Sequence, residues 1–147
     1  MSVMLTFSLM LGSLGYKQQV LASSAIASQY AFYTADAALE CLLYADQQQD
    51  LFALPATEPA NPPPITCDGS FVPFSSSVLL YDAGVNWTIW ERLSLDSGRR
   101  CADITVYKPA VGTGTTYLFS QAYDVSCATV SSPNGARFVS RGLNASY

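Results

Sequence analysis

The chain has 147 residues, of which 50% are apolar and 12% are charged, and its formal net charge is −4. An acidic chain has no basic surface to neutralise phosphates, which argues against a nucleic-acid partner. The sequence contains no histidine, which is the commonest metal ligand and the commonest general base near neutral pH. We therefore expect no enzyme activity and no cofactor, and the apolar composition predicts that part of the chain is surrounded by something other than water.

The first predicted element is a very long helix. Residues 1–16 carry no charged side chain, and the first proline is Pro55. This pattern predicts one helix from the N-terminus to about Phe52, roughly 78 Å long at the rise of an α-helix. Its first half, residues 1–30, is hydrophobic, and its second half, residues 31–52, is amphipathic.

The hydrophobic half can be compared with a membrane span. Its 16 uncharged residues are fewer than the roughly 20 that a spanning helix needs, although Lys17 can extend its ammonium group to the membrane surface. A cleavable secretory signal is the rival interpretation, but the positive segment that begins such signals is absent. Gly12 and Gly15 each weaken a helix by about 1 kcal/mol relative to alanine, so we expect a melt or a bend there.

The amphipathic half carries an apolar stripe that we expect to lie on a sheet. The stripe consists of Phe32, Ala35, Leu39, Leu42 and Leu43. Two pairs of acidic residues also stand four apart in this half, Asp36 with Glu40 and Asp46 with Asp50. Paired carboxylates could serve acid–base chemistry or bind calcium, but we expect them to form a solvated helix face.

A proline-rich segment, residues 53–77, follows the helix and cannot continue it. Its apolar Ile65 and its Cys67 predict a loop wrapped onto the rest of the chain rather than a free linker. The remainder, residues 78–147, reads as short strands between turn formers, which favours an antiparallel meander. The expected strands are Ser77–Tyr81, Val85–Arg92, Ala102–Lys108, Thr115–Val125 and Arg137–Tyr147. Apolar and polar residues alternate in two of these strands, with Val85, Trp87 and Ile89 on one side of the first and Ile104 and Val106 on one side of the second, so each strand should have one buried face. The sequence therefore predicts an α+β fold in which the long helix packs on this sheet.

The four cysteines, Cys41, Cys67, Cys101 and Cys127, are dispersed along the chain. An even number of dispersed cysteines favours two disulfides and an oxidising compartment, and four reduced thiols are the alternative. The equal spacings suggest pairing of Cys41 with Cys67 and of Cys101 with Cys127, although three pairings are open to four cysteines. Each such bridge would stabilise the fold by roughly 3 to 4 kcal/mol on the chain-entropy model.

The arrangement of these elements resembles type IV pilins and their relatives. The most specific stretch is Ala31-Phe32-Tyr33-Thr34-Ala35-Asp36-Ala37-Ala38-Leu39-Glu40-Cys41. It is similar to a motif of PilX-like minor pilins and of pilins from small-genome bacterial lineages, in which a Cys follows the Glu. The C-terminal segment, residues 138–147, is similar to the last strand of such proteins. The resemblance covers the whole chain in architecture, but its motifs are confined to these two segments.

The chain departs from the family pattern near its N-terminus. Family members carry a short basic leader and, after its removal, a Glu at the fifth position, where this chain has Leu5. Alignment on Ala31 and Phe32 suggests about ten further residues before Met1, which would lengthen the apolar run to that of a membrane span.

The resemblance implies a type IV pilin fold and a structural function. Residues 1–30 would anchor the subunit in the inner membrane and then form the core of an extracellular filament, and residues 31–147 would form a globular head. The residues expected to pack in the filament core are Met4, Leu5, Phe7, Leu9, Met10, Leu11, Leu14, Val20, Leu21 and Ile26. The implied partners are identical subunits, the inner membrane, the prepilin peptidase and the pilus assembly machinery.

Three other functions remain open at this stage. The chain could be a pseudopilin of a secretion or DNA-uptake machine, a membrane-anchored monomer, or an adhesin. The adhesin hypothesis depends on an aromatic surface formed by Trp87, Trp90, Tyr117 and Tyr123. Aromatic side chains on short strands are more often part of a core, so we expect these four to be buried.

Overall fold

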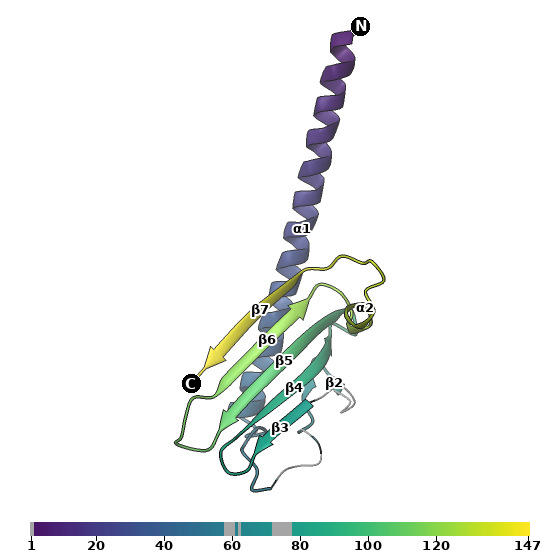
Figure 1. The fold of residues 1–147 in the computed structure, drawn as a ribbon. Coiled ribbons are helices and arrows are strands. Elements are labelled where there is room, and N and C mark those ends of the chain that lie inside the picture. The colour runs from purple at the N-terminus through teal and green to yellow at the C-terminus, as the bar shows by residue number, and fades with distance from the viewer. Residues whose placement is uncertain (1, 58–60, 62, 72–77) are drawn as a thin grey trace.

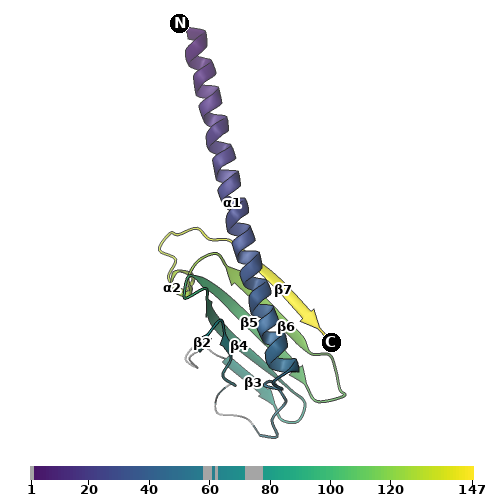
Figure 2. The same ribbon diagram turned by 180° about the vertical axis from the view of Figure 1, so that it is seen from behind.

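The computed structural model describes the backbone of residues 2–57, 61, 63–71 and 78–147, and the side chains of residues 15–57, 61, 63–69 and 80–147. It has an α+β architecture in which one long helix, α1 (Ser2–Gln47), crosses one face of an antiparallel sheet (Figures 1 and 2). The N-terminal part of α1 projects well beyond the sheet, and its C-terminal part lies on it.

The sheet is a five-stranded antiparallel meander in the order β3-β4-β5-β6-β7. Its strands are β3 (Val78–Asp82), β4 (Asn86–Leu95), β5 (Arg100–Pro109), β6 (Tyr117–Tyr123) and β7 (Ser140–Ser146). All five were expected from the sequence, with ends that differ by a few residues. Short turns connect the first four strands, and the β4–β5 turn contains Asp96, Ser97 and Gly98 with positive φ angles.

Two small elements were not expected. A two-stranded hairpin, β1 (Thr66–Cys67) with β2 (Ser70–Phe71), lies within the predicted loop 53–77. A short helix, α2 (Cys127–Ser131), follows β6. Its N-cap is Ser126, whose hydroxyl accepts a hydrogen bond from the Thr129 amide. A serine that is not followed by a run of apolar residues is only a weak sequence signal for the start of a helix.

Helix α1 ends earlier than predicted, at Gln47 rather than near Phe52. Asp50 takes a positive φ of 49°, and the Leu51 amide donates a hydrogen bond to the Ala45 carbonyl. A residue in this left-handed conformation reverses the chain and ends a helix. The reversal turns Phe52 into the core, where its side chain is fully buried.

The core lies between α1 and the inner face of the sheet. Alternate residues of β4 are buried, from Trp87 to Leu95, and Ile104 and Val106 of β5 are buried on the same face, as the alternation predicted. Val85 is the exception: it precedes β4 and is exposed. The helix contributes Ala31, Ala35, Ala38, Leu39, Leu42 and Ala45. Small alanines allow the helix axis to approach the sheet closely, because they fill little space at the contact.

The predicted helix stripe needs one correction. Ala35, Leu39 and Leu42 are buried and Leu43 is partly buried, but Phe32 is 44% exposed. Phe32 lies at the edge of the stripe, and its neighbour Ala31 occupies the contact with the sheet instead.

Both disulfides have the pairing that the spacing suggested. Cys41 is bonded to Cys67, which ties α1 to the β1–β2 hairpin, and Cys101 is bonded to Cys127, which ties β5 to α2. Ile65, beside the first bridge, is 1% exposed and packs in the core. The described part of the loop is therefore wrapped onto the head, as predicted.

Candidate functional site

The most distinctive surface is the projecting half of α1, defined here as residues 2–27. Among the described residues, the first helix side chain with a hydrogen bond to the head is that of Ser28, whose hydroxyl accepts from Arg141 Nε of β7 at 2.8 Å. Ala31 is the first buried side chain of the helix among those described. At about 1.5 Å per residue, the projecting half is roughly 40 Å long, and Figure 1 shows that no strand lies beside it.

The described side chains of the projecting half are apolar on several sides of the helix. Tyr16 and Leu21 are 70% and 68% exposed, and Val20 and Ile26 are also exposed. The exposed polar residues Lys17, Gln18, Gln19, Ser23 and Ser24 lie between them, so the segment is mixed rather than apolar all round. Its exposed apolar side chains are unfavourable in water, and such surface is normally covered by lipid or protein. No other segment in the described part of the chain covers these residues.

The residues predicted for filament packing fall into two groups. Val20, Leu21 and Ile26 are exposed on the projecting half, where a neighbouring molecule could reach them. The remaining predicted residues have helical backbone, but their side chains lie outside the described part of the structure: Met4, Leu5, Phe7, Leu9, Met10, Leu11 and Leu14.

The melt or bend predicted at Gly12 and Gly15 does not occur in the single chain, where α1 is continuously helical through both. The reason is cooperativity: two glycines weaken the helix by only about 2 kcal/mol in total, while a break would forfeit several consecutive backbone hydrogen bonds. Within residues 15–47, whose side chains are described, α1 holds no stretch with the length and apolar character needed to cross a bilayer.

At its other end, α1 is fixed to the sheet by a buried ion pair. Lys108 Nζ lies 2.6 Å from both carboxylate oxygens of Asp46. The Tyr147 hydroxyl donates a hydrogen bond to the same carboxylate. The pKa of Tyr147 is raised mainly by burial and, to a smaller extent, by its interaction with this carboxylate. Asp46 is thus buried, contrary to the solvated face predicted for it, because a partner 62 residues away neutralises its charge.

The pairing sets α1 in register with β5 and with the last residue of the chain. The other predicted acidic residues, Asp36, Glu40 and Asp50, are exposed as expected.

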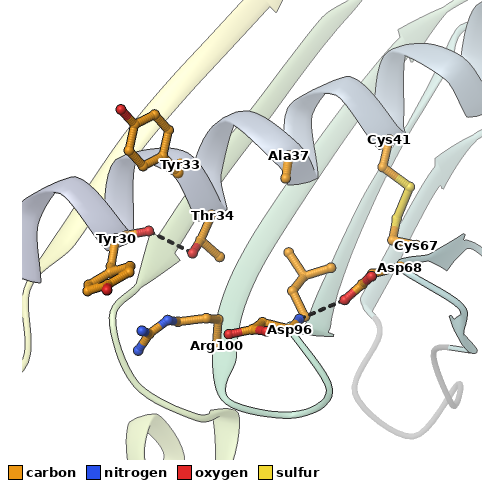
Figure 3. Close-up of a pocket in the computed structure, with 10 residues that line it drawn as sticks. Tyr30, Tyr33, Thr34, Ala37, Cys41, Cys67, Asp68, Asp96 and Arg100 are labelled. Carbon is orange, nitrogen blue, oxygen red and sulfur yellow. Dashed lines mark hydrogen bonds between the residues drawn. A yellow bond between two sulfur atoms is a disulfide. The ribbon is translucent and has the colours of Figure 1, made fainter.

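A groove of about 380 Å³ lies between α1 and the β4–β5 turn, beside the Cys41–Cys67 disulfide (Figure 3). The Arg100 guanidinium stacks 4.5 Å from the centre of the Tyr30 ring. On the opposite side, Asp68 accepts a hydrogen bond from the Asp96 amide at 2.8 Å. The polar groups that line the groove are therefore largely engaged with one another.

A second hollow of about 370 Å³ lies on the outer face of the sheet, which α1 does not cover (Figure 1). Trp90 and Phe119 flank Thr105 in one row across β4, β5 and β6. In the next row Arg92 forms a two-pronged ion pair with Asp103, with distances of 2.6 and 2.8 Å. The hydrogen bond to Asp103 raises the pKa of Arg92, so the guanidinium is charged at all ordinary pH values.

The four aromatic residues considered for a binding surface divide between the two faces. Trp87 is buried in the core, as predicted, and its indole N–H donates a hydrogen bond to the Phe52 carbonyl at 3.0 Å. Trp90 and Tyr123 are partly buried, and Tyr117 is 54% exposed. The prediction of burial is therefore wrong for Tyr117, because the outer face of its strand is uncovered.

Glu91 is a buried carboxyl group that was not expected from the sequence. It lies on the inner face of β4 between Ile89 and Leu93 and is 4% exposed. Its Oε2 atom has no hydrogen-bond partner among the described residues, and neither has the Ser120 hydroxyl two strands away. Burial raises the pKa of Glu91 from 4.5 to about 7. Strand alternation from Trp87 would have placed Glu91 inside, and was the available signal.

The raised pKa predicts that the head loses stability as the pH rises. Glu91 binds a proton more tightly in the folded state than in the unfolded state. Protonation therefore stabilises the folded state below the unfolded pKa of 4.5, and this stabilisation is lost as the pH rises from 4.5 to about 7. We expect a loss of about 3 kcal/mol between pH 4.5 and 8, at roughly 1.4 kcal/mol per pH unit.

Urea unfolding at a series of pH values measures this loss. Glu91→Gln should remove most of the pH dependence, whereas the control Glu40→Gln, at an exposed position, should preserve it. An unchanged slope in Glu91→Gln would show that another group is responsible.

Comparison with protein-family models, with curated proteins and with solved structures gives no match to this chain.

Proposed function

We propose that the chain is a structural subunit, a pilin, that polymerises through the projecting half of α1 into an extracellular filament of the type IV pilus kind. The observation that carries the proposal is the projecting half of α1, which is roughly 40 Å long and whose described apolar side chains are exposed. It is attached to a disulfide-bonded head. The motif similarity at residues 31–41 agrees with this function. The filament would support adhesion, motility or DNA uptake at the cell surface.

The physical reason is that one apolar surface can be covered in two environments. Before assembly, lipid of the inner membrane covers the projecting half, and in the filament equivalent helices of neighbouring subunits replace the lipid. Neither state exposes much apolar surface to water. In such a filament each subunit contacts the next through two different faces. When the rotation from one subunit to the next does not close into a ring, the result is an open helical polymer.

The head is suited to an exposed position in such a filament. The buried Asp46–Lys108 ion pair holds the C-terminal half of α1 on the sheet. The two disulfides tie α1 to the β1–β2 hairpin and β5 to α2. Disulfides are typical of proteins that work outside the reducing cytoplasm.

Immunogold labelling of surface appendages sheared from the source cell tests the proposal. Continuous label along filaments is the expected result for a major subunit, and label at tips or bases would indicate a minor pilin. Unlabelled filaments with antigen confined to the membrane fraction would contradict polymerisation and favour a pseudopilin or an anchored monomer.

An adhesin is a second candidate, favoured by the hollow that Trp90 and Phe119 flank on the outer face of the sheet. Aromatic rings beside a few fixed polar groups are typical of ligand sites. Binding on a glycan array that is lost in Trp90→Ala, but kept in Val111→Ala at an exposed loop position, would support this function.

A further inference from the structure

Residues 1–35 contain a single charged side chain, Lys17, and it lies on the projecting half of α1. The ion pairs found among the described residues are Arg92–Asp103 and Lys108–Asp46, so Lys17 belongs to neither. In the proposed filament this ammonium group would leave water and enter an apolar surrounding. Such a transfer is strongly unfavourable unless a carboxylate accompanies the charge.

Helix α1 itself supplies two candidate carboxylates, Asp36 and Glu40. Both are exposed, whereas the third acidic residue of the helix, Asp46, is already paired with Lys108. Asp36 and Glu40 are four residues apart, a spacing at which like charges repel one another on a helix. A cation placed between them would relieve that repulsion.

The positions of these three residues exclude pairing within one chain but suit pairing between copies. At 3.6 residues per turn, Lys17 stands five full turns above Ala35, which is buried against the sheet. Lys17 is therefore on the sheet side of the helix. Asp36 and Glu40 lie roughly 100° and 140° further round, on the solvent side, and about 29 and 35 Å along the axis.

We propose that Lys17 of one subunit forms an ion pair with Asp36 and Glu40 of a neighbouring, parallel subunit. The inference rests on the proposed filament, because only a second copy places these groups in contact. It assigns the face of the neighbour's helix that the projecting half contacts, namely the side opposite the sheet. It also sets the axial displacement of the paired subunits at about 29 to 35 Å.

Carbodiimide cross-linking tests the pairing directly, because this reagent joins an amine to a carboxylate only where the two are in contact. The chain has two lysines, Lys17 and Lys108, so mass spectrometry can assign each product. Filaments should yield a peptide in which Lys17 is linked to Asp36 or Glu40, and detergent-dispersed chains should not. Lys17→Arg is the matched control, since it keeps the charge and the filament but removes the reactive amine.

Charge exchange provides an independent measurement. Lys17→Glu should lower the filament yield at least tenfold, and adding Asp36→Lys and Glu40→Lys should restore it. Adding Asp50→Lys instead, at an exposed acid beyond the helix, should not restore it. Because Lys17 lies outside the head, Lys17→Glu should leave the unfolding midpoint of the head unchanged.

The outcomes separate this inference from the proposed function. Wild-type filaments that give no Lys17 cross-link, and that tolerate Lys17→Glu, would overturn the ion pair and leave the filament intact. Failure of the wild-type chain to form any filament would overturn the function and the ion pair together.

Discussion

Replacing Leu21 by Asp is expected to abolish filament assembly while leaving the head folded. Leu21 lies on the projecting half of α1 and is 68% exposed in the single chain. Burial of a leucine side chain contributes about 1.5–3 kcal/mol, and the unpaired carboxylate of the variant adds a desolvation cost. A loss of about 3 kcal/mol per subunit raises the concentration needed for assembly roughly a hundredfold.

Sedimentation of filaments and electron microscopy measure this effect. The matched control is Val111→Asp, which introduces the same charge at an apolar residue that is fully exposed in the β5–β6 loop. The control should assemble like the wild-type chain. Normal filaments from Leu21→Asp would contradict the assignment of the projecting half as the contact surface.

Replacing Asp46 by Ala is expected to destabilise the head by about 3 kcal/mol, the lower end of the range for breaking a buried ion pair. The Asp46 side chain is 1% exposed and that of Lys108 is 19% exposed. The substitution leaves the Lys108 ammonium group and the Tyr147 hydroxyl without their shared acceptor. The energetic cost arises from these stranded polar groups rather than from the lost attraction alone.

Urea unfolding of the full-length chain in mild detergent, followed by tryptophan fluorescence, measures the change, because Trp87 is buried in the core. Asp36→Ala, at an exposed position of the same helix, is the control and should change stability by less than about 0.5 kcal/mol. The double substitution of Asp46→Ala with Lys108→Met should recover much of the loss. Equal stability of Asp46→Ala and the wild-type chain would contradict the buried pairing.

The sequence predicted the main elements because their signals are local. Alternation at Trp87, Ile89, Ile104 and Val106 identified the inner face of the sheet, and the absence of proline identified the helix. The disulfide pairing agrees with the one that the equal spacings of the cysteines suggested, with a separation of 26 residues between the partners of each bridge.

The remaining features depend on contacts between residues far apart in the sequence. Burial of Asp46 could not be predicted from its helix, because the partner Lys108 is 62 residues away. The end of α1 at Gln47 depends on the positive φ of Asp50, for which the surrounding residues gave no clear signal. Of the candidate site, composition identified the projecting half, while the position of Lys17 relative to the sheet required the helix packing.

Helical reconstruction by electron cryo-microscopy of filaments formed by this chain tests the central claim most directly. We expect a core of closely packed α1 helices, with Val20, Leu21 and Ile26 buried between subunits and the sheets of the heads on the outside. A filament whose subunits are joined through the sheets, with the projecting halves of α1 exposed to solvent, would contradict it.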